Sequence, residues 1–246
     1  MAIYSNGQVG WHSGVVAPVT PSIVTNGLIL NLDAGNASSY PGSGTLWTDL
    51  SGQNNNGTLV NGVGYSSANG GALTFDGVND YIDLGSQTSF NLTNMSISIW
   101  VKMDNSITSN SFIAGRYHNT NSDNGWHISY NPTTQKFKFD GRESAALYIS
   151  NETTNNYNKN TWYNITGTKS ANTWSIYVNG VLDTTQNVGL GNVAFLSNQM
   201  QLGGMVTFFG SFYSKCSIGN TLMYNKSLSS SEVLQNFNAT KTRFGL

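Results

Sequence analysis

The sequence predicts an all-β protein, a sandwich of two antiparallel sheets. Short apolar runs recur along the chain, and most are followed by Gly, Asn or Asp at the turn. Gly is abundant at 27 residues while Pro numbers only 4, which is typical of a turn-rich β protein. Only one segment, near the C-terminus, shows a helix signal. With 246 residues, 38% of them hydrophobic, the chain can form one domain with a substantial core.

Residues 1–26 are predicted to form an extended attachment arm ahead of the domain, which spans 27–246. The arm is interrupted by Gly and Pro and shows no sustained hydrophobic period. A disordered end is the alternative. The segment is nevertheless too apolar for a free linker, so we expect it to dock onto a partner or a neighbouring copy. The expected assembly contacts in it are Ile3, Tyr4 and Trp11.

Strands follow from residue 28 onward. Met95, Ile97, Ile99 and Val101 alternate with polar residues and Trp100, which predicts a core strand. The other strands expected from apolar runs and flanking turn residues are 28–33, 58–60, 72–75, 81–84, 112–116, 125–130, 136–140, 146–150, 162–169, 200–203 and 217–224.

Two local signals complete the predicted fold. Asn179-Gly180 lies between two apolar runs in residues 174–184 and predicts a hairpin with a type I′ turn. Ser229 and Glu232 have the spacing of a capping box, and an apolar face follows at Val233, Leu234 and Phe237. A short C-terminal helix is therefore expected.

Charge and cysteine content exclude several classes of function. Lys plus Arg is 11 and Asp plus Glu is 12, with no basic run, so nucleic acid and membrane surfaces are poor candidate partners. The single Cys216 excludes an intrachain disulfide or a cysteine zinc site. The N-terminus lacks a signal-peptide pattern, which predicts synthesis in the cytoplasm without secretion.

Several segments resemble, in sequence and order, the laminin-G-like, concanavalin A-like jelly-roll family. They are Leu73–Ile82, Met95–Val101, Trp162–Thr166, Ile176–Gly180 and Ile218–Ser229, and the resemblance covers about residues 27–238. The opening, Gly27–Gly52, looks like the version found in structural proteins of tailed bacteriophages. The resemblance implies a jelly-roll sandwich that binds glycans or proteins, often with a structural calcium ion, and in phages an appended domain on capsid or tail proteins.

From this resemblance and the apolar arm we expect a non-enzymatic, oligomeric virion protein, a capsid decoration or fibre-like appendage that displays its jelly roll to host glycans. The expected partners are other virion proteins, reached through the arm, and further copies of the chain. A free calcium-dependent lectin is the alternative. A divergent glycosidase is disfavoured, because the only glutamates are Glu143, Glu152 and Glu232, and they do not form the acidic strand motif of that group.

A calcium site is expected at the turn that contains Asp76, Asn79 and Asp80. Carboxylate, amide and backbone oxygens are the ligands that calcium prefers. The alternative is an Asx-rich turn whose side chains bond to their own backbone. The turn alone does not supply six oxygens, so the remaining ligands would come from a distant strand.

Two aromatic stretches are candidate contact sites. The expected glycan-binding residues, which combine rings with hydrogen-bonding groups, are Arg116, Tyr117, His118, Asp123 and Trp126. The alternative is a solvated loop with Trp126 turned into the core. A second cluster, Phe208, Phe209 and Phe212, is expected to be an assembly contact.

Overall fold

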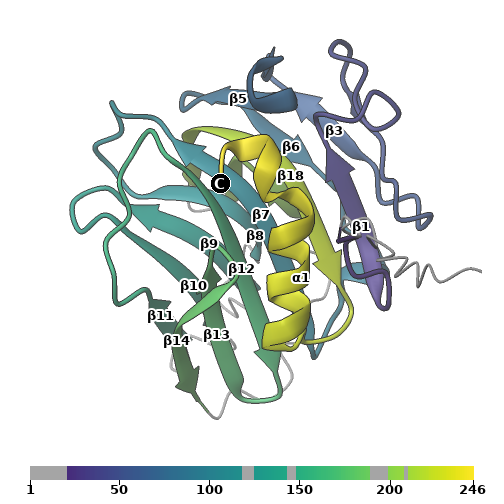
Figure 1. The fold of residues 1–246 in the computed structure, drawn as a ribbon. Coiled ribbons are helices and arrows are strands. Elements are labelled where there is room, and N and C mark those ends of the chain that lie inside the picture. Colours follow the sequence, from purple (N-terminus) through teal and green to yellow (C-terminus); the bar gives the residue numbers. More distant parts are fainter. Residues whose placement is uncertain (1–20, 118–124, 143–147, 189–198, 208–209) are drawn as a thin grey trace, which may run out of the picture.

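The computed structural model describes residues 21–117, 125–142, 148–188, 199–207 and 210–246. Within these residues two antiparallel sheets pack face to face and a small hairpin lies against one of them (Figure 1). The predicted all-β sandwich is confirmed.

The first sheet, sheet A, contains the long central strands. Its hydrogen-bonded order is β14 (Val181–Asn187), β13 (Thr173–Val178), β12 (Trp162–Ser170), β7 (Met95–Met103), β18 (Lys215–Tyr224), β5 (Ala72–Asp76) and β4 (Gly64–Ser66), and β1 (Leu28–Asp33) also pairs with β18. β18 can pair with both β5 and β1 because its ten residues present successive segments to them, 215–218 and 220–224.

The second sheet, sheet B, faces it across the core. Its order is β11 (Tyr148–Glu152), β10 (Lys136–Arg142), β9 (Gly125–Asn131), β8 (Ser111–Tyr117), β15 (Met200–Leu202), β6 (Tyr81–Asp83), β3 (Gly57–Val60) and β2 (Leu46–Trp47). A hairpin of β16 (Gly204–Thr207) and β17 (Gly210–Tyr213) packs outside β8. Short 3₁₀ turns lie at η1 (Ala68–Gly70) and η2 (Thr88–Phe90).

The core lies between the two sheets and is filled by large rings. Met95, Ile97, Ile99 and Val101 of β7 are buried in it, as their alternation predicts. From the other strands and loops come the fully buried rings Trp47, Phe90, Trp126, Tyr130, Phe137, Phe139 and Trp174. In β10 Gly141 makes room for Trp174, because a Cβ there would lie 2.2 Å from the indole. Packing at this density fixes how the two sheets sit on each other.

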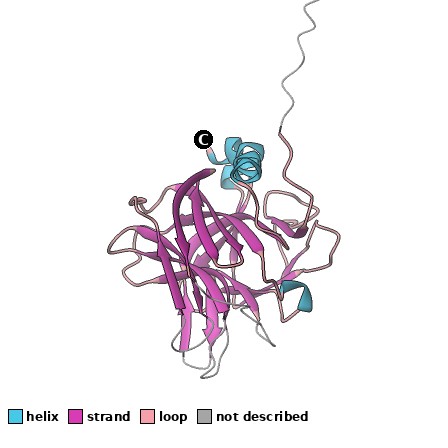
Figure 2. Ribbon diagram, turned by 90° about the horizontal axis from the view of Figure 1, so that it is seen from below, coloured by secondary structure: helices cyan, strands magenta, loops and turns pink. Residues whose placement is uncertain are grey.

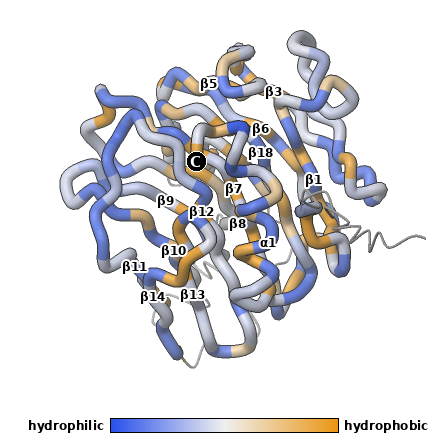
Figure 3. Tube along the Cα trace, in the orientation of Figure 1, coloured by the Kyte–Doolittle hydropathy of each residue, from blue (hydrophilic) through white to orange (hydrophobic). Residues whose placement is uncertain are grey.

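Helix α1 (Ser230–Thr240) covers the outer face of sheet A (Figures 1 and 2). The predicted capping box is present: Ser229 accepts from the Glu232 N–H, and Glu232 accepts from the Ser229 N–H. Apolar and polar residues alternate along the helix in Figure 3, and the 3₁₀ turn η3 (Lys241–Phe244) continues it. Among the described residues, no helix is long and apolar enough to cross a membrane.

The chain enters the body of the domain before the predicted boundary at Gly27. Val24 is buried, its N–H donates to Asn236 of α1 at 2.8 Å, and its carbonyl accepts from the Tyr224 hydroxyl at 2.9 Å. Ile3, Tyr4 and Trp11 of the predicted arm lie outside the described residues. The described end of the arm is therefore fixed beside α1.

Small elements depart most from the sequence prediction. The sequence indicated neither β2, β4 nor the β16–β17 hairpin, and the strand expected at 146–150 is found at Tyr148–Glu152. These strands are two to five residues long, so they contain too few positions to show an alternating pattern. The predicted Asn179-Gly180 turn is confirmed, with φ of 51° and 79°.

Candidate functional site

A groove of about 340 Å³ lies on the outer face of sheet B. It is formed where β9, β10 and β11 run side by side, at the left of Figure 1. Among the described residues, those that line it are His127, Asp140, Gly141, Arg142, Tyr148, Ile149 and Ser150. The groove combines an exposed ring with hydrogen-bonding and charged groups, which is the composition expected of a site for a polar ligand.

Strand register places the polar side chains in two neighbouring rows. In one row Asp140 lies between His127 and Ser150; in the next, Arg142 lies opposite Tyr148. Side chains directly opposite each other on one face have Cβ atoms roughly 5 Å apart. The intervening residues, such as Phe139, point into the core because side chains alternate along a strand. Each row therefore presents adjacent groups to the same ligand.

The inner end of the groove is a histidine–carboxylate pair. His127 Nε2 lies 3.4 Å from Asp140 Oδ2, and the two side chains are only 15% and 19% exposed. Gly115 of β8 lies opposite His127, and a Cβ at 115 would come within 2.8 Å of the His127 Cβ. The glycine thus allows the close approach of β8 to β9 at the imidazole.

The β16–β17 hairpin supports the imidazole indirectly. The Phe112 ring lies 4.6 Å from the His127 ring and 5.0 Å from the Phe212 ring, between centroids. The Ser214 hydroxyl also donates to the Phe112 carbonyl at 2.5 Å. The hairpin therefore packs on the outer face of sheet B beside the groove and holds Phe112 against His127.

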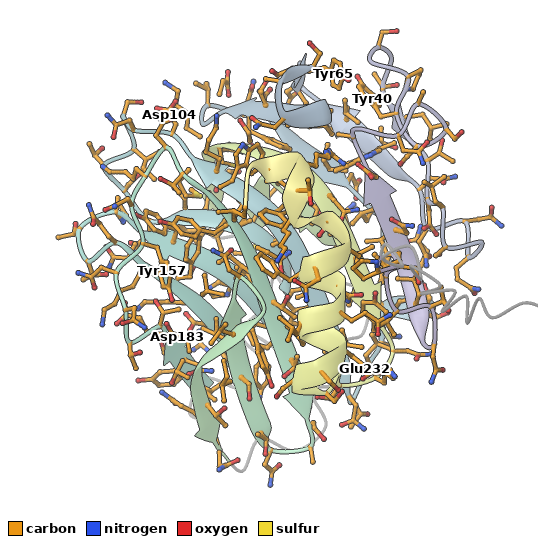
Figure 4. All side chains as sticks on the ribbon, viewed as in Figure 1. Tyr40, Tyr65, Asp104, Tyr157, Asp183 and Glu232 are labelled. Carbon is orange, nitrogen blue, oxygen red and sulfur yellow. The ribbon has the colours of Figure 1, made fainter. Side chains whose placement is uncertain are left out.

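The segment that follows β11 is held to sheet A by Asp183 of β14 (Figure 4). Asp183 accepts from the Thr154 N–H at 2.5 Å and from the Tyr157 hydroxyl at 2.5 Å, and it also bonds to Asn155. Burial alone would raise the pKa of Asp183, but these hydrogen bonds outweigh it and lower the pKa. Burial, reinforced by Asp183, raises the pKa of Tyr157. This polar cluster fixes the edge strand that supplies Tyr148 and Ser150.

Two of the five glycan-binding residues predicted from sequence, Arg116 and Trp126, are described and do not line this groove. Trp126 and Arg116 are both fully buried and point into the core, so neither side chain is placed to contact a ligand. Arg116 donates to the Gln87 carbonyl at 3.3 Å, and burial lowers its pKa to about 10. His118 and Asp123 lie outside the described residues, and of Tyr117 only the strand position at the end of β8 is described.

The predicted calcium turn makes local hydrogen bonds. Asp76 Oδ1 accepts from the Val78 N–H at 2.8 Å, and Asp80 Oδ2 accepts from the Asp76 N–H at 3.1 Å. Asp76 and Asn79 are exposed. Of the side-chain oxygens of these three residues, Asp80 Oδ1 is the one that is buried without a hydrogen-bond partner among the described residues. One such oxygen falls well short of the six to eight that calcium takes. The geometry is that of an Asx turn and fits calcium poorly; the site stays a prediction.

Of the second aromatic cluster, Phe212 lies on β17 and is 43% exposed, whereas Phe208 and Phe209 are outside the described residues. The sequence did contain a signal for the groove. In 136–142, Lys136, Lys138, Asp140 and Arg142 alternate with Phe137, Phe139 and Gly141, which predicts a charged outer face. What the sequence did not reveal is that β9 and β11 are the neighbours that complete the site.

Comparison with known proteins identifies the family of this fold. The family model described as the concanavalin A-like lectin/glucanases superfamily matches residues 76–234. The chain belongs to this superfamily. The matched segment contains β9, β10 and β11, and with them the described residues that line the groove. A search of curated proteins found no match.

Solved structures share the fold at low sequence identity. A Trypanosoma rangeli sialidase in complex with sialic acid is 18% identical with a TM-score of 0.66; the match covers 89% of this chain and 34% of that one. The binding domain of Paraclostridial Mosquitocidal Protein 1 is 17% identical, with a TM-score of 0.69 and coverage of 87% and 52%. Domain 4 of AbnA, an arabinanase from Geobacillus stearothermophilus, in complex with arabinotriose, is 17% identical, with a TM-score of 0.65 and coverage of 85% and 97%. This chain thus spans about a third of the sialidase.

Proposed function

We propose that the chain is a carbohydrate-binding domain that holds a glycan in the groove on the outer face of sheet B. The observation that carries the proposal is the exposed Tyr148 ring, 66% exposed, at the rim of a groove that also contains His127, Asp140 and Arg142. An aromatic face packs against the apolar face of a sugar ring while neighbouring polar groups bond to its hydroxyls. The arabinotriose complex of a similarly folded domain supports the same ligand class.

We propose binding without hydrolysis. Glycoside hydrolysis uses two carboxyl groups that flank the scissile bond as acid and as base or nucleophile. On this face Asp140 pairs with His127, and Glu152 pairs with Lys138 at 3.7 Å. Each of these two carboxylates thus contacts a basic side chain of the neighbouring strand.

Glycan binding by Tyr148→Ala tests the site. We expect the affinity for glycan to fall at least tenfold, on a glycan array and in calorimetry, because the variant removes the ring face. Ser150→Trp, which fills the groove, should also lose binding. Tyr65→Ala is the matched control, since Tyr65 is a partly exposed tyrosine on β4 of the other sheet. Unchanged binding by Tyr148→Ala and Ser150→Trp, with unchanged melting temperature, would place the site elsewhere; release of reducing sugar would indicate hydrolysis.

We propose further that this domain is displayed on a phage particle through residues 1–20. The support is the phage-like opening at 27–52 and the fixed attachment of Val24 to Asn236 and Tyr224. Many displayed copies would offset weak binding at each site, because linked sites raise the effective concentration.

Deletion of residues 1–20 tests display separately from glycan binding. The cut should leave Val24 in place, because a chain that begins at Gly27 would also lose the bonds to Asn236 and Tyr224. We expect the shortened chain to bind glycan as before but to lose particle incorporation, and any oligomer seen by light scattering should dissociate. Incorporation at the full-length level would overturn the role of the arm.

A further inference from the structure

We infer that the groove selects an acidic glycan, whose sugars carry carboxylate or sulfate groups, and that Arg142 is the residue that selects it. This inference rests on the carbohydrate binding proposed above and names the class of sugar. It is carried by the placement of Arg142 directly opposite the exposed Tyr148, across β10 and β11.

The outer face of β10 concentrates positive charge. Lys136, Lys138 and Arg142 are three of the 11 basic residues of the chain, and the strand period places them on the same face with Asp140. Two acidic groups of this face, among the described residues, contact basic side chains: Glu152 pairs with Lys138, and Asp140 lies against His127.

The chemistry of Arg142 matches an acidic group. A guanidinium presents five N–H donors in a planar fork, and two of them bond to the two oxygens of a carboxylate or sulfate. Because five donors are available, a ligand can bind Arg142 while another residue also contacts it. A sugar ring packed on Tyr148 would bring a substituent on its edge to the guanidinium, since opposite side chains lie roughly 5 Å apart at Cβ.

The rest of the molecule does not attract acids in general. The formal net charge is −1, so long-range attraction gives no advantage to an acidic ligand. Asp140 also lies in the groove and would repel an acidic group placed directly over it. Discrimination is therefore expected from the direct contact at Arg142, which lies in the neighbouring row, and not from the charge of the whole protein.

The test uses matched pairs of glycans that differ only in the acidic group. The full chain is applied to an array of oligogalacturonate beside its methyl ester, sialylated beside desialylated glycans, and sulfated beside unsulfated glycosaminoglycan fragments. We expect the acidic member of at least one pair to bind tenfold or more above its neutral partner. The pairs that respond distinguish a carboxylate from a sulfate.

Variants assign the preference to the residue. Arg142→Gln should reduce the preference for the acidic member about tenfold, the contribution of a charge-assisted hydrogen bond, because it should weaken binding of the acidic member much more than binding of the neutral member. Arg142→Lys should restore it in part, because an ammonium keeps the charge without the fork. Lys241→Gln is the control for loss of one charge, since Lys241 begins η3, which continues α1 over the opposite sheet.

The outcomes separate this inference from the proposed function. Equal binding of acidic and neutral members, with loss of both in Tyr148→Ala, would overturn the acidic class and keep the carbohydrate site. An acidic preference that persists in Arg142→Gln would overturn the role of Arg142. Binding to no glycan would overturn both proposals.

Discussion

The two outer faces of the sandwich differ in what covers them. The outer face of sheet A lies beneath α1 and η3, where Trp100 stacks on Phe244 at 4.1 Å and donates to Thr240 at 2.8 Å. The outer face of sheet B at β9–β11 carries charged side chains and a groove instead. The difference teaches that one face of the same fold can be used for stability while the other remains available for a ligand. Substitutions should therefore separate the two properties.

Trp100→Ala is expected to have the largest effect on stability. Its side chain is fully buried, packs between the sheet and the rings of Phe237 and Phe244, and bonds to Thr240. Loss of a buried ring of this size costs about 3–5 kcal/mol of unfolding free energy. Urea denaturation measures the loss, and glycan affinity per folded molecule should stay unchanged. Trp100→Phe should lose less unfolding free energy, because a ring remains. A loss of glycan affinity in folded Trp100→Ala would contradict the separation of the two faces.

Gly141→Ala should affect both properties, because this residue belongs to both regions. Its backbone lines the groove, while an added Cβ would meet Trp174 in the core at 2.2 Å. Overpacking of this kind costs about 1–3 kcal/mol, and displacement of β10 would also weaken glycan binding. The double variant Gly141→Ala, Trp174→Phe should lose less unfolding free energy than the sum of the losses in the two single variants. If the two losses simply add, the added Cβ does not collide with Trp174.

Asp80→Asn tests whether a buried carboxylate in the turn between β5 and β6 costs stability. Burial raises the pKa of Asp80, so the folded state disfavours the charged form. That cost is present at neutral pH and is relieved as pH falls through the raised pKa. We expect the variant to melt higher than the wild type at pH 7, with the gain shrinking towards pH 4. If calcium binds here, the variant will instead melt lower in millimolar calcium, and a chelator will lower the melting point of the wild type.

The sequence was informative where a strand has one buried face. The alternation from Met95 to Val101 predicted β7 and its core-facing side correctly, because burial on one face leaves a period of two. The same alternation places Trp126 on one face with Ile128 and Tyr130, and the structure bears out the alternative in which Trp126 turns into the core.

Other features depended on contacts that no local pattern records. The groove exists because β9, β10 and β11 are neighbours in a particular register, and register is decided by tertiary packing. Arg116 is fully buried, although arginine is a residue type that is mostly exposed. The position of Arg116 on β8 directs its side chain into the core. The residue type alone would not indicate this burial. The β16–β17 hairpin similarly depends on packing against distant β8.

The smallest effects should come from two ion pairs, one on each face. Lys138 and Glu152 on sheet B lie 3.7 Å apart with side chains about a third exposed, so Lys138→Gln should cost less than about 0.5 kcal/mol. Lys226 and Glu232 lie 2.5 Å apart, and Glu232 also belongs to the capping box that starts α1 (Figure 4). Lys226→Gln should therefore cost more, up to about 1 kcal/mol.

The pH dependence of this pair distinguishes the two faces. Hydrogen bonds from Lys226 and from the Ser229 N–H lower the pKa of Glu232. The stability that Glu232 contributes is therefore fully present above its unfolded-state pKa. This stability is lost as pH falls through the lower, folded-state pKa. Glu232→Gln should abolish that part of the acid dependence, whereas Glu152→Gln provides the matched control on the other sheet. Equal acid dependence of the unfolding free energy in both variants would contradict this difference. It would show that the ion pair at the helix cap contributes no more pH-dependent stability than the Lys138–Glu152 pair, which has no cap.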